Sequence, residues 1–150
     1  MAMAESPRLA PFTVSLPGRE DAVRGGLTKT MARLCDLKLS KDEAGTVELV
    51  LAEALNNIIE HALSASVIQT RITIRGDASP QGLELTIIDH GVPMPKGVAP
   101  IGLQPDVDVP VQDLPEGGYG WFMIHTLATK VQYARVKHEN HLTILLPVGI

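Results

Sequence analysis

The sequence predicts an α/β (α+β) two-layer sandwich: one mixed, mostly antiparallel sheet covered on one face by helices. Three observations predict it. Strand-like and helix-like segments do not alternate strictly, as they would in a parallel βαβ fold. Apolar residues make up 45% of the chain and charged residues 20%, which is an ordinary globular composition. The length of 150 residues corresponds to a single domain, 1–150.

The first half of the chain predicts one strand and two helices. Residues 12–16 alternate apolar and polar side chains, as a half-buried strand does. Apolar residues then recur every three or four positions through 19–37, which predicts a helix. Ser40 and Glu43 form a capping box that begins a second helix, 40–63. Its apolar stripe consists of Val47, Val50, Leu51, Ala54, Ile58 and Ala62.

The second half predicts four strands, a helix and a long loop. Residues 67–75 carry Ile68, Ile72 and Ile74 on one sheet face, and 83–88 form the next strand, which ends in the β-branched pair Ile87-Ile88. A hairpin connection lies between them. Residues 90–118 carry six prolines and little periodicity, which favours a functional loop such as a lid. A helix and two closing strands follow at 119–131, 132–137 and 141–146. Residues 1–11 are expected to form a loose arm.

The composition excludes several classes of protein. A net charge of −4 without a cluster of Lys and Arg argues against nucleic-acid binding. No apolar run reaches the roughly 20 residues that span a bilayer, and the N-terminus lacks the pattern of a signal peptide. Cys35 is the single cysteine, so no intrachain disulfide is expected. We therefore expect a cytoplasmic protein that binds neither membrane nor nucleic acid.

A polar line runs along the predicted central helix. Glu53, Asn57 and His61 are four residues apart, so they share one helix face and offer a carboxylate, an amide oxygen and an imidazole in a row. If this helix face lines a ligand site, these three side chains can bind the ligand. The alternative is a solvated helix surface.

Two glycine-bearing segments offer further chemistry. Asp89 and Gly91 follow a strand, where a carboxylate can accept from an exocyclic amine and a glycine lets the backbone approach a flat ring. The alternative is a plain turn. The segment 116–120, Glu-Gly-Gly-Tyr-Gly, leads into a helix and can cradle phosphates with its amides. It matches neither the Walker nor the Rossmann pattern. A hinge is the alternative.

Together, these segments resemble the GHKL (HATPase_c) ATPase superfamily, which has the Bergerat ATP-binding fold. The resemblance rests on E-x-x-x-N-x-x-x-H on a helix, D-x-G after a strand, and G-x-G opening a helix after a long loop. It covers residues 12–147. The small size narrows it to the anti-sigma factor serine/threonine-protein kinases, the RsbW-like branch.

The resemblance implies roles for the polar line. Glu53 matches the general base toward the attacking hydroxyl. Asn57 matches the ligand of Mg²⁺, a hard ion that prefers oxygen. His61 completes the pattern, and we expect it to be packed or capped rather than chemically active.

The resemblance also implies a site for the adenine base. Asp89 would bind its amino group, and Gly91 would lie beside the ring. Pro93 stands where the family has its second glycine, and the proline fixes φ and removes an amide donor. Thr143, on the last strand, matches a hydroxyl near adenine.

The phosphates are assigned in the same way. Gly118 and Gly120 match the glycines whose amides meet the phosphates, and residues 95–117 match the ATP lid. Tyr119 stands where relatives often carry Arg, whose charge would help to neutralise the γ-phosphate. Lys96, at the start of the lid, is a candidate substitute.

The function implied is an ATP- and Mg²⁺-dependent protein serine/threonine kinase acting as an anti-sigma factor. It would bind a sigma factor, phosphorylate an anti-anti-sigma (STAS-type) partner and form a homodimer. The rival interpretation is a non-catalytic nucleotide-binding regulatory module that binds partner proteins. Glu53 favours the kinase, and the missing Arg favours the binder. A third interpretation is an α/β sandwich without nucleotide function.

Overall fold

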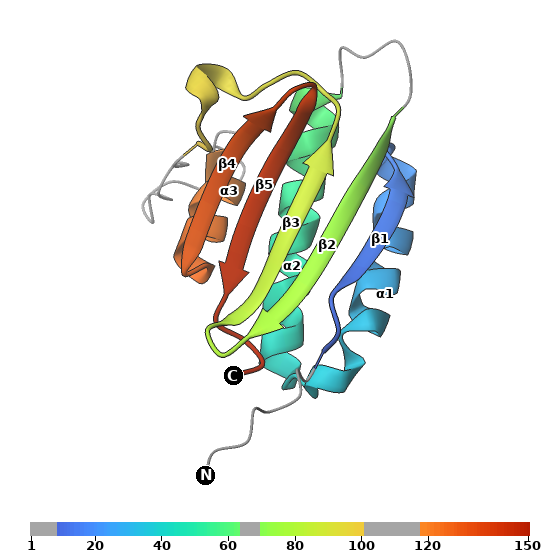
Figure 1. Ribbon diagram of the computed structural model, residues 1–150, viewed down its shortest axis with the longest axis vertical. Coiled ribbons are helices and arrows are strands. Elements are labelled where there is room, and N and C mark those ends of the chain that lie inside the picture. The colour runs from blue at the N-terminus through green and yellow to red at the C-terminus, as the bar shows by residue number, and fades with distance from the viewer. Residues whose placement is uncertain (1–8, 64–69, 101–117) are drawn as a thin grey trace, which may run out of the picture.

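The computed structural model describes residues 9–63, 70–100 and 118–150, and its described residues form a two-layer sandwich (Figure 1). One layer is a sheet of five strands. They are β1 (Phe12–Pro17), β2 (Arg71–Ser79), β3 (Gly82–Asp89), β4 (Lys130–Val136) and β5 (Glu139–Leu146). The strand order is β1-β2-β3-β5-β4, and all four pairings are antiparallel. The predicted fold class is therefore confirmed.

The helices lie together behind the sheet in Figure 1 and leave its other face uncovered. They are α1 (Val23–Arg33), α2 (Lys41–Asn57) and α3 (Gly118–Leu127). The predicted capping box begins α2: the Glu43 amide donates to Ser40 Oγ at 3.1 Å, and the Ser40 amide donates to Glu43 Oε1 at 3.0 Å. At its other end, α2 widens into a π turn, Ile58–Ala62.

The core lies between α2 and the middle of the sheet. The predicted stripe of α2 is buried at Val47, Val50, Leu51, Ala54 and Ile58. Alternate side chains of the strands face it, among them Ile74, Leu85, Ile87 and Ile144, which are fully buried. This packing fixes the end of α2 behind the end of β3, where the candidate site residues gather.

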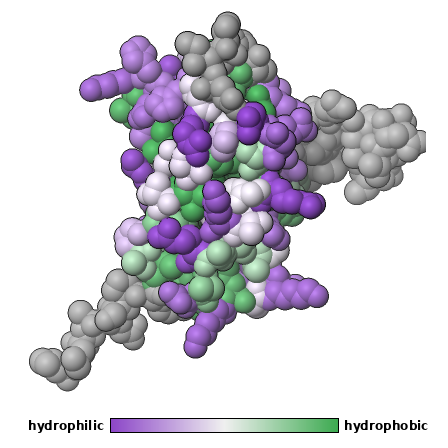
Figure 2. All heavy atoms as spheres, turned by 90° about the vertical axis from the view of Figure 1, so that its right-hand side faces the viewer, coloured by the Kyte–Doolittle hydropathy of each residue, from purple (hydrophilic) through white to green (hydrophobic). Residues whose placement is uncertain are grey.

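The surface over α1 and β1 intersperses hydrophilic and apolar side chains (Figure 2). No helix in the described part of the chain combines the length and the apolar character needed to cross a membrane.

Two predicted boundaries differ from the structure because strand pairing extends further than the sequence pattern. β2 continues to Ser79, since its last residues pair with β3. The helix predicted at 119–131 ends at Leu127. The Thr129 amide donates to the carbonyl of Leu145 at 2.8 Å, and Val131 pairs with Ile144 in the sheet.

Other predictions fall wholly or partly outside the described residues. These are the arm at 1–8, the strand start at 67–69, the lid at 101–117 and the side chains of Lys96 and Tyr119. Leu9 is described, and it is buried in the core instead of belonging to a loose arm. The predicted helix at 19–37 is α1 with a short 3₁₀ turn on either side.

Candidate functional site

A cavity of about 560 Å³ opens where α2, β3, β5 and α3 end or begin. Its polar lining consists of Asn57, His61, Asp89 and Asn140, and its apolar lining includes Met94 and Trp121. Two of the residues that the sequence singles out, Asn57 and Asp89, therefore face one hollow. A concave, mostly apolar pocket with a few converging polar groups is the usual form of a small-molecule site.

Asp89 is the acid in the described lining of this cavity, and 2% of its surface is exposed. Its Oδ1 accepts from the Gly91 amide at 2.8 Å and from Asn140 Nδ2 at 2.9 Å. Among the described residues, Oδ2 accepts no hydrogen bond, so it is available to a ligand. Burial raises the pKa of Asp89, although its hydrogen bonds from Asn140 and Gly91 and the nearby Arg135 oppose the shift.

Gly91 lies so close to the end of the π turn that a residue with a side chain would not fit at this position. A Cβ at this position would collide with the carbonyl oxygen of Ala62, at the end of the π turn. That same carbonyl accepts from the Val92 amide at 2.9 Å. The π turn therefore ties the segment after β3 to the end of α2, in keeping with the tendency of π turns to occur at functional sites.

Glu53 and Gly120 lie against each other across the contact between α2 and α3. A Cβ at Gly120 would collide with Glu53 Oε2 and would lie 3.6 Å from Asn57 Nδ2. Because Gly118 begins α3, Gly120 belongs to its first turn, where backbone N–H groups lack partners within the helix. The structure thus brings a carboxylate, an amide and a helix N-terminus together, as the sequence predicts.

The amide of Asn57 is oriented by the helix itself. Nδ2 donates to the carbonyl of Glu53 at 2.8 Å, so Oδ1 must point the other way. In the described part of the chain, no donor reaches Oδ1, although Asn57 is only 8% exposed. An oxygen in this state fits Mg²⁺, which takes few protein ligands and completes its shell with phosphate oxygens and water. The described residues contain no cluster of three or more His, Cys, Asp or Glu that could hold a metal without such help.

Two further predicted residues, His61 and Pro93, lie at the solvent-exposed part of the cavity lining. His61 lines the cavity but is exposed, with its Nε2 3.6 Å from the Glu60 carboxylate. Pro93 also lines the cavity and is exposed.

The assignment of Thr143 to the adenine site does not agree with the structure. In the register of β3 and β5, Asn140 pairs with Asp89 and Thr143 pairs with Thr86. Side chains alternate along a strand, so Thr143 lies on the uncovered face of the sheet while Asn140 faces the cavity. Thr143 Oγ1 is 3.4 Å from Thr86 Oγ1.

Asn140, Tyr133 and Arg135 belong to the site, and the sequence reasoning missed them. Asn140 Nδ2 donates to Asp89 and, at 2.8 Å, to the Val92 carbonyl. Its Oδ1 accepts from Tyr133 and from Arg135 Nη1. The sequence signal that could have found Asn140 is the alternation of side chains along β5. It places Asn140 on the core face together with Leu142 and Ile144, and its two neighbours on the other face.

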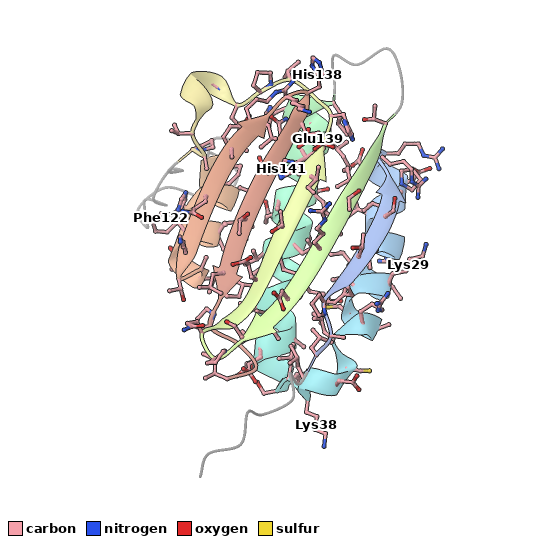
Figure 3. The ribbon with its side chains drawn as sticks, viewed as in Figure 1. Lys29, Lys38, Phe122, His138, Glu139 and His141 are labelled. Carbon is pink, nitrogen blue, oxygen red and sulfur yellow. The ribbon has the colours of Figure 1, made fainter. Side chains whose placement is uncertain are left out.

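Those neighbours, Glu139 and His141, lie on the uncovered face at the start of β5 (Figure 3). His141 Nε2 is 3.0 Å from Glu139 Oε1, and this hydrogen bond lowers the pKa of Glu139. This half-buried pair is therefore separated from the buried network by the sheet.

Comparison with known proteins identifies the family to which the chain belongs. The family model described as "Histidine kinase-like ATPase domain" matches residues 15–146. The Serine-protein kinase RsbW of Bacillus cereus is 29% identical over 145 residues, covering 93% of this chain and 84% of the relative. That of Bacillus mycoides is 29% identical over 119 residues, covering 78% and 71%.

Among solved structures, the RsbU and RsbW domains of a Mycobacterium tuberculosis protein match with a TM-score of 0.62 at 14% identity. The match covers 93% of this chain and 32% of that chain, so this chain spans about a third of the solved one. At this identity, the likeness supports the fold alone. Because the family model matches nearly the whole sandwich, the protein belongs to the histidine kinase-like ATPase domain family and is similar to its RsbW members.

Proposed function

We propose that the chain is an ATP- and Mg²⁺-dependent protein serine/threonine kinase that acts as an anti-sigma regulatory factor. The observation that carries the proposal is the convergence of Glu53, Asn57 and Gly120 beside the cavity that contains Asp89. The relatives named serine-protein kinases support it. Its partners would be a sigma factor and an anti-anti-sigma (STAS-type) protein, and we propose a homodimer.

In this proposal, the nucleotide site has a base end in the cavity and a phosphate end beside it. At the base end, formed by Asp89, Gly91 and Asn140, the free Asp89 Oδ2 accepts from the adenine amino group. Gly91 lets the backbone pass close to the ring, and the exposed Pro93 borders it. A carboxylate acceptor matches an amine donor and leaves the oxo group of guanine without a donor.

The phosphate end is formed by Glu53, Asn57, Gly118 and Gly120. The amides of the first turn of α3 favour negative charge, which suits a triphosphate. Asn57 Oδ1 would hold Mg²⁺, which would neutralise charge on the phosphates when bound.

Glu53 serves as the general base in this proposal. It accepts the proton of a serine or threonine hydroxyl as that oxygen forms a bond to the γ-phosphorus. The bond from the γ-phosphorus to the β,γ-bridging oxygen breaks, and ADP leaves with the electron pair. Phosphorylation adds about −1.5 to −2 charge to the partner, which weakens an interface that was formed without it.

The test measures ATP binding by calorimetry with and without Mg²⁺, and phosphoryl transfer from labelled ATP to an anti-anti-sigma protein of the same cell. For Glu53→Gln, transfer should fall by about 10²–10⁴-fold, the usual contribution of a general base, with ATP affinity nearly unchanged. Glu48→Gln is the matched control, because Glu48 is exposed on the same helix. Undiminished transfer by Glu53→Gln would remove this residue from its role, and absence of ATP binding by the wild type would overturn the nucleotide site.

A second candidate function is a nucleotide-operated switch without catalysis. Tyr119 favours it, because it stands where an arginine is often found in relatives and offers no positive charge to a γ-phosphate. In this case ATP binds and changes partner affinity. ADP would then fail to accumulate when both ATP and the partner protein are supplied.

A further inference from the structure

Tyr133 and Arg135 reach the site from β4, the edge strand beyond β5. They are two residues apart, so both side chains lie on the same face of the strand. Both donate to Asn140 Oδ1, Arg135 through Nη1 at 3.0 Å. Neither belongs to the described lining of the cavity, so they act on a ligand through the groups they hold rather than by direct contact.

The hydroxyl of Tyr133 has a fixed direction. It accepts from the Met94 amide at 3.0 Å, and a backbone N–H can only donate. The hydroxyl proton therefore has to point elsewhere, and it is donated to Asn140 Oδ1. Arg135 carries donors only, so its contact with Asn140 has the same direction.

These two donors decide which end of the Asn140 amide faces Asp89. With Oδ1 turned to Tyr133 and Arg135, Nδ2 faces Asp89 Oδ1 and the Val92 carbonyl, both of which accept. In the flipped orientation, Oδ1 would face these two acceptors and Nδ2 would face two donors. Buried polar groups that are left unpaired in this way are costly.

The same two side chains also hold the backbone after β3. Tyr133 binds the Met94 amide, and Arg135 Nη1 donates to the Gly91 carbonyl at 2.7 Å. The Gly91 amide in turn donates to Asp89 Oδ1. Both donors to Asp89, Asn140 and Gly91, are thus held in place by residues of β4, and both bind the same carboxylate oxygen.

We propose that Tyr133 and Arg135 are positioning residues for base selection. By orienting Asn140 and Gly91 onto Asp89 Oδ1, they leave Oδ2 as the oxygen of this carboxylate that no described donor reaches, directed to the amino group of an adenine nucleotide. The inference rests on the proposed function, because it names how the base end distinguishes purines. It predicts that Tyr133 and Arg135 affect recognition of the amino group and leave binding of the triphosphate intact.

The experiment compares the affinity of the full chain for ATP and for purine riboside 5′-triphosphate, which lacks only the 6-amino group. The wild type should prefer ATP by about tenfold or more, as expected for a hydrogen bond to a charged acceptor. In Tyr133→Phe and in Arg135→Gln, this preference should fall roughly three- to tenfold because ATP binds less tightly, with the affinity for the analogue unchanged. Gln132→Ala is the matched control, because Gln132 is exposed on the same strand and its side chain points to the other face.

The readout separates positioning from general loosening of the fold. A loosened site would lower the affinity for both nucleotides by the same factor and leave the preference unchanged, and this result would overturn the proposal. Variants that bind both nucleotides with wild-type affinity would also overturn it. A wild type that binds the two nucleotides equally would also overturn it but would leave the phosphate end standing. A wild type that binds neither would overturn the proposed function itself.

Discussion

The two ends of the proposed nucleotide site are built by different means. At the base end, Asp89 and Asn140 are buried and joined by hydrogen bonds from three strands and the segment after β3. At the phosphate end, Glu53 and Gly120 meet by close contact between helices, and Asn57 presents an oxygen without a protein donor in the described residues. The base end is therefore organised before a ligand arrives, whereas the phosphate end leaves its charge and coordination to be completed by the ligand.

This comparison predicts that the two ends fail differently. A change at the phosphate end should act through space and charge, and its main effect should be on phosphoryl transfer. A change at the base end should act through the availability of one oxygen atom, and its main effect should be on the choice of nucleotide.

The largest of these effects is expected from Gly120→Ala. The added Cβ would collide with Glu53 Oε2, so the carboxylate has to move. A displacement of about 1 Å at a catalytic group can cost about 100-fold in rate, and we expect a loss of this size in phosphoryl transfer. The measurement is transfer of labelled phosphate to the partner protein.

Gly45→Ala provides the control for Gly120→Ala. Gly45 lies within α2, and apart from its neighbours along the helix no described atom lies within 4 Å of where its Cβ would be. This variant should keep the wild-type rate and gain about 0.5–1 kcal/mol in the free energy of unfolding, because alanine favours helices. Transfer by Gly120→Ala at the rate of Gly45→Ala would show that the phosphate end is not close-packed.

The base end should respond to pH with a smaller effect. Only the ionised Asp89 can leave Oδ2 as a pure acceptor, and burial raises the pKa of this group above its usual 3.8. As pH falls through the raised pKa, the preference for ATP over purine riboside triphosphate should shrink by up to about tenfold. Asp89→Asn should show a small preference that does not change with pH. A wild-type preference that is constant down to the pH range of an exposed carboxylate would contradict this.

The ionised form of Asp89 that base selection needs is the form that the raised pKa makes unfavourable for folding. A raised pKa means that the folded state binds the proton more tightly than the unfolded state. The favourable contribution of Asp89 is therefore complete below the unfolded pKa and is lost as pH rises through the folded pKa. At neutral pH, Asp89→Asn should raise the melting temperature of the nucleotide-free protein while it weakens base selection. The base end thus trades stability for recognition.

The sequence predicted most of the fold and, in the candidate site, the placement of the side chains on α2. Local rules cover these parts: a capping box begins α2, and four-residue spacing places Glu53 and Asn57 on one helix face. The sequence did not reveal Asn140, Tyr133 or Arg135. Their roles depend on strand register, which pairs β5 with β3 across a gap of some fifty residues, as in the hydrogen bond from Asn140 to Asp89.

Thr143 was misplaced for the same reason and gives the smallest predicted effect. It lies three residues beyond Asn140 on β5, and an odd spacing puts it on the uncovered face, beside Thr86. Thr143→Val should leave the affinity for ATP and the preference over purine riboside triphosphate within about twofold of wild type. The lost hydroxyl contact should cost at most about 1 kcal/mol in the free energy of unfolding, measured by urea titration. A selective loss of ATP affinity in this variant would mean that β5 is shifted by one residue against β3, because only such a shift moves Thr143 to the cavity face and Asn140 away from it.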